Sequence, residues 1–244
     1  MSCSSQPKNT GRARQTAWRL IFWSLFLVLL VLFGAGMAHL LGGLILAGAG
    51  CLIALWVLFS LYCLLFFQDP RIRPPTDPNL LLAPACGKAD WVGETEQGPP
   101  SPGPWKRVSI FMSVFDVHLQ YAPCRARVVE TKYRPGAFGN ALRLESADLN
   151  EQLWIGLEPL DHPGERIWVR LIAGLIARRI ECWVQIGEEV APGDRIGMIR
   201  LGSRVELFFP PSWELTLAQG ARVRGGVTIV AQKSKDHAKE QSKQ

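Results

Sequence analysis

The stretch Val184–Ile196, VQIGEEVAPGDRI, and its counterpart Leu217–Ile229, LAQGARVRGGVTI, decide the fold. In each stretch apolar residues and glycines alternate at every third position, and all five positions of the first recur 33 residues later in the second. Glycine adopts the positive φ of a tight turn without a steric penalty. The pattern therefore predicts, twice over, a strand, a tight turn and a second short strand.

The sequence around these two stretches is also typical of strands. Branched and aromatic residues dominate short runs bounded by Gly or Pro, as in Val108–Met112, Ile167–Ile172, Arg179–Val184 and Val205–Phe209. We therefore predict a mainly β domain over residues 68–232, in which the two repeat units form a barrel-sandwich of the kind seen in lipoyl and biotinyl domains.

An apolar segment precedes this domain. Leu20–Phe67 contains no Asp, Glu, Lys or Arg over 48 residues, and one membrane crossing needs about 20 apolar residues. Glycines cluster near its middle, so we expect a transmembrane hairpin of two helices over residues 19–67, with its turn near His39–Gly43. A disordered basic leader is expected before it, over residues 1–18, and a charged tail over residues 233–244.

Basic residues flank the apolar segment at both ends, and they predict its orientation. They are Lys8, Arg12, Arg14 and Arg19 before it and Arg71 and Arg73 after it. Cationic flanks stay in the cytoplasm. The β domain is therefore expected at the cytoplasmic face of the cell (inner) membrane, where the net charge of +6 suits anionic lipid headgroups.

Other classes of site lack their sequence signals. The six cysteines form no CxxC pair, and a cytosolic domain keeps its thiols reduced. We expect no metal site, because no His, Cys or carboxylate cluster has ligand spacing. Basic residues are spread along the chain without a block, so no nucleic-acid partner is expected.

Gly202-Ser203, between the two repeat units, is a candidate for chemistry, although a Gly–Ser pair by itself is nearly always a turn. The surrounding sequence, Ile199–Leu207 (IRLGSRVEL), joins two strand-like runs. A glycine on the carbonyl side leaves that carbon sterically open to attack by the hydroxyl of the following serine.

Six blocks, in order along the chain, resemble those of phosphatidylserine decarboxylases, particularly the short archaeal-type enzymes. The blocks are Phe66–Pro70 (FFQDP), Pro84–Lys88 (PACGK), Ser109–His118 (SIFMSVFDVH), Tyr133–Phe138 (YRPGAF), Ile172–Trp183 (IAGLIARRIECW) and Gly197–Glu206 (GMIRLGSRVE).

This resemblance implies a self-processing carboxy-lyase. The Ser203 hydroxyl attacks the Gly202 carbonyl, and β-elimination of the resulting ester leaves a dehydroalanine. This rearranges to an imine, which water hydrolyses with release of ammonia, so that a covalent pyruvoyl cofactor replaces Ser203. A large chain, 1–202, and a small chain, 203–244, then form a heterodimer. The pyruvoyl carbonyl forms a Schiff base with the amine of the phospholipid substrate and accepts the electrons released with CO₂, converting phosphatidylserine to phosphatidylethanolamine in phospholipid biosynthesis.

The resemblance also implies roles for other residues. It places a functional Asp at Asp116, and positions 116 and 118 share one face of a strand, so Asp116 and His118 are candidate catalytic groups. Arg178 and Arg179 are candidates for gripping the lipid phosphate or carboxylate, although pairing with Glu181 explains such an arginine equally well. Departures from the family pattern are Cys86 for an Asp, Val114 for a Pro, and Ala141 where many members carry a His.

Alternative functions remain open at this point. A lipoate or biotin carrier domain needs a lysine at a hairpin tip, and the chain has none between Lys132 and Lys233. A non-catalytic membrane-tethered binding or adaptor protein could use the same barrel-sandwich without cutting itself. A decarboxylase for another serine-headgroup lipid, such as archaetidylserine, would share every motif.

Overall fold

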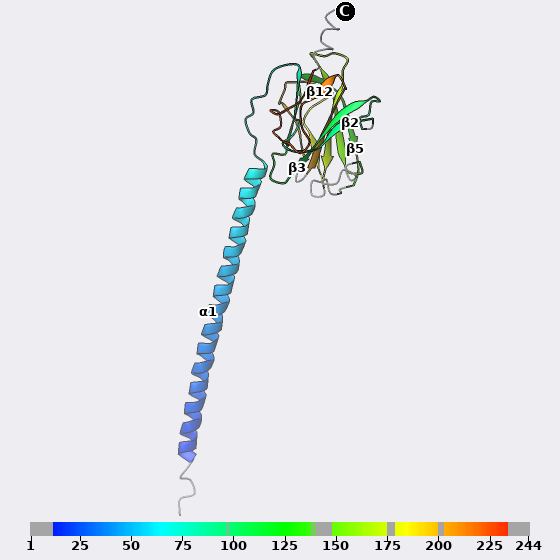
Figure 1. Cartoon of the computed structure of the whole chain (residues 1–244). Helices are drawn as coiled ribbons and strands as arrows, with labels where there is room; N and C mark the ends of the chain where they lie inside the picture. Colours follow the sequence, from blue (N-terminus) through cyan, green and yellow to red (C-terminus); the bar gives the residue numbers. More distant parts are fainter. Residues whose placement is uncertain are drawn as a thin grey trace, which may run out of the picture. The chain divides into compact units, whose positions relative to one another are not determined.

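The computed structural model of the chain describes residues 12–96, 98–137, 139, 148–174, 179–199 and 203–233 (Figure 1). These residues divide into two compact units, Met1–Tyr62 and Cys63–Gln244. The first contains most of a helix, and the second contains all of the strands.

The apolar segment forms one continuous helix, α1 (Arg12–Phe66), in place of the predicted hairpin. The expected turn near His39–Gly43 is absent, and residues 12–18 of the predicted leader belong to the helix. The physical reason is that no proline interrupts the segment, while each of its glycines weakens a helix by only about 1 kcal/mol.

Helix α1 is long and apolar enough to cross a membrane. Its apolar part, Phe22–Phe66, has 45 residues, which corresponds to about 68 Å at 1.5 Å per residue. The hydrocarbon core of a bilayer is about 30 Å thick. The apolar length is therefore about twice what one perpendicular crossing requires.

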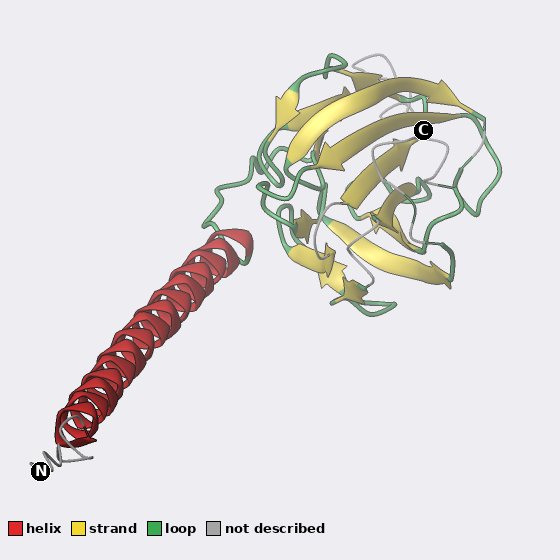
Figure 2. Ribbon diagram, turned by 90° about the horizontal axis from the view of Figure 1, so that it is seen from below, coloured by secondary structure: helices red, strands yellow, loops and turns green. Residues whose placement is uncertain are grey.

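The second unit is mainly β, as predicted (Figure 2). Its strands are β1 (Leu80–Leu82), β2 (Gly87–Thr95), β3 (Trp105–Met112), β4 (Leu119–Tyr121), β5 (Ala126–Arg134), β6 (Gln152–Pro159), β7 (Ile167–Ala173), β8 (Ile180–Cys182), β9 (Glu189–Val190), β10 (Arg195–Ile199), β11 (Ser203–Phe209), β12 (Trp213–Leu215), β13 (Arg222–Val223) and β14 (Ile229–Lys233). All four runs that the sequence singled out lie on or overlap these strands.

Eight strands form one curled antiparallel sheet in the order β13-β2-β3-β11-β7-β6-β5-β9. Strand β11 lies inside it, paired with β3 on one side and with β7 on the other. Two smaller sheets, β4-β10-β8 and β1-β14-β12, complete the unit.

The repeat units behave locally as predicted. All four of their turn glycines, Gly187, Gly193, Gly220 and Gly226, have positive φ. The units contribute β9 and β13, which are the two edge strands of the large sheet. Of the predicted lipoyl-like barrel-sandwich, only the mainly β character is therefore confirmed. The body of the domain is the curled eight-stranded sheet.

The large sheet is covered on both faces. On one face Val205, Leu207 and Phe209 join the main apolar core. On the other, Phe208 packs with Trp105, Trp154 and Trp168. Lys233, which the sequence placed in the tail, is instead buried in β14, where it forms an ion pair with Glu165.

Candidate active site

Ser203 is the first residue of β11, and its side chain is completely buried. It lies opposite Met112, the last residue of β3, and opposite Ala173, the last residue of β7. Gly202 and Arg178 lie outside the described residues. The serine of the expected cleavage site is thus held inside the sheet by two neighbouring strands.

Three chain connections meet at this end of the sheet. Strands β3, β11 and β7 are neighbours in the large sheet, and their partners along the chain, β4, β10 and β8, are neighbours in a small one. Ser203 begins β11, the middle strand of the first three. The connection from β3 to β4 carries Asp116 and His118, and Arg179 lies directly before β8. The topology therefore gathers these four candidate residues at one end of the two sheets.

Asp116 lies in a turn and not on a strand, which corrects the prediction that positions 116 and 118 share a strand face. Its Oδ2 accepts hydrogen bonds of 2.8 Å from both the backbone N–H and the hydroxyl of Ser113, so the carboxylate closes the turn directly after β3. Its Oδ1 lies 3.8 Å from a guanidinium nitrogen of Arg222. The carboxylate is thus fixed near the end of β3.

His118 is buried, with 1% of its surface exposed. Its Nδ1 lies 2.7 Å from the backbone carbonyl oxygen of Asp116, and the ring of Phe66 stacks on it at 4.2 Å between centroids. Burial lowers the pKa of His118, against smaller raising effects from the hydrogen bond to Asp116 and from the charge of its carboxylate. A neutral His118 that donates from Nδ1 carries its lone pair on Nε2, which suits it to accept a proton.

A chain of buried contacts connects Ser203 with His118. The Ser203 hydroxyl lies 3.4 Å from the sulfur of Met112, and the amide nitrogen of Gln120 lies 3.7 Å from the same sulfur. That amide nitrogen also donates to the backbone carbonyl of His118 at 2.9 Å. Sequence reasoning missed Met112 and Gln120. The available signal was their position inside or just beyond the SIFMSVFDVH block.

Two cavities adjoin these residues. One, of about 190 Å³, is lined by His118 together with Phe66, Trp183, Arg195 and Met198 among others. The other, of about 460 Å³, is lined by residues that include Asp116, Cys86, Phe115, Arg222 and Arg224. Asp116 and His118 therefore line different cavities.

Arg179 is 70% exposed, and its Nε lies 3.8 Å from a carboxylate oxygen of Glu181, the acid named as its alternative partner. Among the described residues no group of three His, Cys, Asp or Glu is placed to hold a metal ion.

Comparisons with known proteins identify the family of this chain. The family model of phosphatidylserine decarboxylase matches residues 59–231. Curated relatives named phosphatidylserine decarboxylase proenzyme include one from Desulfotalea psychrophila, 38% identical over 73% of this chain and 82% of the relative. Others are from Trichlorobacter lovleyi, 39% identical over 82% of this chain and 89% of the relative, and from Magnetococcus marinus, 39% identical over 71% and 78%.

These matches extend over most of the chain and most of each relative. They show the class of protein, which is a carboxy-lyase that is made as a proenzyme. The chain belongs to the phosphatidylserine decarboxylase family.

Proposed function

We propose that this chain is a proenzyme that cuts itself between Gly202 and Ser203 and then decarboxylates phosphatidylserine to phosphatidylethanolamine. The observation that carries the proposal is the position of Ser203, buried at the start of a central strand and next to the connection that contains Gly202. A serine needed only for a turn would gain nothing from this burial. The proenzyme names of the relatives agree with a processing step.

In the cutting step, the Ser203 hydroxyl attacks the Gly202 carbonyl carbon and the peptide nitrogen leaves it, so an ester replaces the amide. A base then removes the α-proton of Ser203, and the ester oxygen departs with the carboxyl group of Gly202. The large chain ends at residue 202, and the small chain of 42 residues, 203–244, begins with the altered residue.

His118 is the residue best suited to accept protons in this site. Its lowered pKa keeps it neutral at pH 7, and its Nδ1 contact with the Asp116 carbonyl selects the tautomer with an unprotonated Nε2. Asp116 acts through position: by closing the turn at Ser113 it holds the segment that carries His118.

Elimination leaves a dehydroalanine at position 203, whose imine tautomer takes up water and releases ammonia to give a pyruvoyl group. This group would supply the electron sink that decarboxylation of an α-amino acid headgroup requires. The site fits such a group, because the serine from which it derives is enclosed by Met112 and Ala173 and needs no separate binding cradle. The small cavity lined by His118 offers a neutral base for the serine headgroup, beside the ion pair of Arg195 with Asp69.

Arg178 and Arg179 are proposed to bind the phosphate or carboxylate of the lipid. The Arg179 guanidinium is exposed, and its ion pair with Glu181 at 3.8 Å is long enough to be exchanged for a substrate anion.

We further propose that α1 anchors the enzyme in the cell membrane with the β unit on the cytoplasmic side. Arg71 and Arg73 follow the helix within seven residues and favour this side. For a single crossing, the basic residues at the other end of the helix favour the opposite side, so the orientation is decided by experiment. A tethered enzyme meets a bilayer-bound substrate by lateral diffusion. Protease digestion of sealed vesicles of known orientation tests this proposal. The β unit must be protected when the cytoplasmic face is inside.

Fragment masses decide the proposed function. The wild-type chain is expected to give two pieces, the smaller spanning 203–244 with a blocked N-terminus, and to form phosphatidylethanolamine. Ser203→Ala is expected to remain one chain and to be inactive, whereas Ser212→Ala serves as the matched control and cuts normally. An intact wild-type chain that is fully active would overturn the mechanism and favour a different use of the fold.

Serine-headgroup lipids with other backbones, such as archaetidylserine, are the second candidate substrates. Activity on phosphatidylserine and archaetidylserine, compared in mixed micelles, separates the two. The non-catalytic adaptor alternative requires both lipids to remain unchanged.

A further inference from the structure

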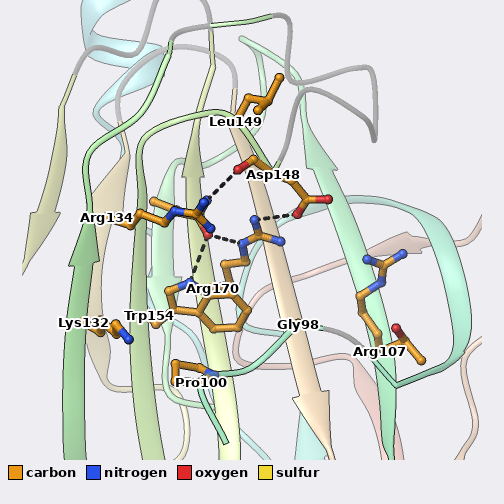
Figure 3. A pocket seen from close by; sticks show the side chains of 11 residues that line it. Gly98, Pro100, Arg107, Lys132, Arg134, Asp148, Leu149, Trp154 and Arg170 are labelled. Carbon is orange, nitrogen blue, oxygen red and sulfur yellow. Dashed lines mark hydrogen bonds and ion pairs between the residues drawn. The ribbon is translucent and has the colours of Figure 1, made fainter. Parts of the chain in front are cut away.

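A larger cavity, of about 750 Å³, lies on the other face of the large sheet (Figure 3). Side chains alternate between the two faces along a strand. Ser203 therefore shares its face with Val205 and Leu207 in the apolar core, whereas Glu206 points to the opposite face, where it pairs with Arg170 of the cavity lining. The sheet itself separates this cavity from the Ser203 side chain.

Four basic residues from three strands line the cavity. Lys132 and Arg134 lie two residues apart on β5, Arg170 lies on β7, and Arg107 lies on β3. Strand register explains part of this convergence, because Lys132 is paired with Trp154, and Trp154 is paired with Arg170. Figure 3 shows Lys132 and Arg134 along one strand, Arg107 across from them, and Trp154 with Arg170 between.

The acids nearby do not balance these cations. Glu206 is 1% exposed and is shared by Arg170 at 3.0 Å and Arg107 at 3.7 Å. Asp148 pairs with Arg170 at 2.9 Å. These four residues thus compensate one another, and Lys132 and Arg134 remain as excess positive charge. Neither has an acidic partner among the described residues.

The lining also holds hydrogen-bond donors that are not fully used. Lys132 and Arg134 are exposed. The Nε of Arg107 is buried and has no hydrogen-bond partner among the described residues. Leaving a buried donor unsatisfied is costly, so an anion that accepts from it is favoured. Trp154, over which the Arg170 guanidinium stacks at 4.9 Å, adds an aromatic wall.

We propose that this cavity is a second binding site, separate from the cleavage site, for a phosphate-bearing anion. Guanidinium groups match phosphate oxygens in bidentate fashion, and the lysine adds a point charge. The volume suits a phosphate ester or a phosphodiester headgroup better than a small inorganic ion. The same chemistry could come from the headgroup of an anionic phospholipid or from a soluble phosphate ester.

Calorimetric titration of the full chain with inorganic pyrophosphate tests the site. The protein is held in phosphatidylcholine nanodiscs and carries Ser203→Ala, so that the result does not depend on self-cleavage. The test variant is Lys132→Gln with Arg134→Gln. The control, Arg125→Gln with Arg127→Gln, removes two charges at and directly before the opposite end of the same strand.

Pyrophosphate is expected to bind, and the test variant should weaken it at least about tenfold, the effect of losing one charge-assisted hydrogen bond or more. The control should leave the affinity within about twofold. Absence of binding, or equal weakening by both double variants, would overturn the proposal.

A second arm identifies the source of the phosphate. The titration is repeated in nanodiscs in which about one fifth of the lipid is phosphatidylglycerol, an anionic lipid. If lipid headgroups occupy the site, pyrophosphate binds more weakly there than in phosphatidylcholine, and the difference disappears in the test variant. If soluble phosphate esters are the ligands, the two affinities agree. Either result supports the binding site, and the one that is observed identifies the source of the phosphate.

Discussion

The hydroxyl of Ser203 lies 3.4 Å from the sulfur of Met112, across the β11–β3 pairing. A thioether is a weak acceptor, so this contact orients the hydroxyl while leaving its proton available to a stronger base. Met112 is itself completely buried and forms part of the wall around the serine.

This relationship predicts a difference between two substitutions of Met112. Met112→Leu nearly conserves volume and should leave the rate of self-cleavage within about threefold. Met112→Ala opens a cavity beside Ser203 and should slow cleavage by more than about tenfold, because misplacement by about 1 Å is costly to a positioned reaction. Time courses of fragment formation measure both rates. Equal rates in the two variants would show that Met112 does not position the serine.

The pH dependence of cleavage tests His118. Its folded-state pKa is lowered by burial, below the usual value of about 6.5. The neutral, proton-accepting form therefore persists below pH 6.5, and the cleavage rate should fall only at lower pH. His118→Gln should cleave slowly without this acid limb. A wild-type midpoint at or above pH 6.5 contradicts the assignment.

Arg204 and Asp90 form a bidentate ion pair of 2.7 and 2.6 Å, with the Arg204 side chain completely buried. Asp90→Ala leaves the buried guanidinium without this carboxylate, and we expect it to destabilise the fold by about 3–5 kcal/mol. Melting curves in the Ser203→Ala background measure the loss on a single chain. Glu189→Ala, which removes an exposed partner of Arg127, should change the melting temperature little. Similar shifts in melting temperature for Asp90→Ala and Glu189→Ala would refute the distinction between the buried and the exposed ion pair.

The repeat glycines provide a matched pair. Gly220 and Gly226 both have positive φ, but a Cβ on Gly220 would meet nothing within 4 Å, whereas one on Gly226 would lie 2.4 Å from Ile72 Cδ1 and 3.2 Å from Gly193 Cα. Gly220→Ala should cost about 1–2 kcal/mol of backbone strain. Gly226→Ala should cost about 1–3 kcal/mol more, through overpacking. Equal melting temperatures would show that Ile72 moves aside freely.

Glu165 predicts a pH dependence of stability. Burial raises its pKa, but hydrogen bonds from Lys233, Trp213 and Ser212 outweigh this effect, so the folded-state pKa is lowered. The ionised carboxylate therefore stabilises the fold. This stabilisation is fully present above the unfolded-state pKa of about 4.3 and is lost as the pH falls through the folded-state pKa. Melting temperatures of Ser203→Ala and of the same chain with Glu165→Gln should therefore converge as the pH drops from 6 to about 3. A constant gap would rule out this contribution.

Local patterns in the sequence predicted local structure well. The spacing of the repeat glycines predicted the positive φ at Gly187, Gly193, Gly220 and Gly226 because that requirement is decided within a few residues. Branched and aromatic runs likewise predicted β3, β7 and β11. The mainly β fold followed from them, and the order of the family blocks predicted the family.

Features that depend on distant pairing were not predictable in the same way. The turn that removes Asp116 and His118 from a common strand face is closed by a side-chain hydrogen bond that alternation rules ignore. The contact of Ser203 with Met112 depends on the register of two strands about 90 residues apart in the chain. The hairpin was expected from the apolar length and the glycines near its middle, yet without a proline the helix continues.

The position of β11 has a consequence for the mature protein. Once the bond before Ser203 is broken, the released segment remains the middle strand between β3 and β7 and also contributes β14 and β13 to other pairings. It cannot leave without opening the core. The proposed scission divides one chain into two partners that must find each other, so we expect heat or denaturant to inactivate the cut enzyme irreversibly at low concentration.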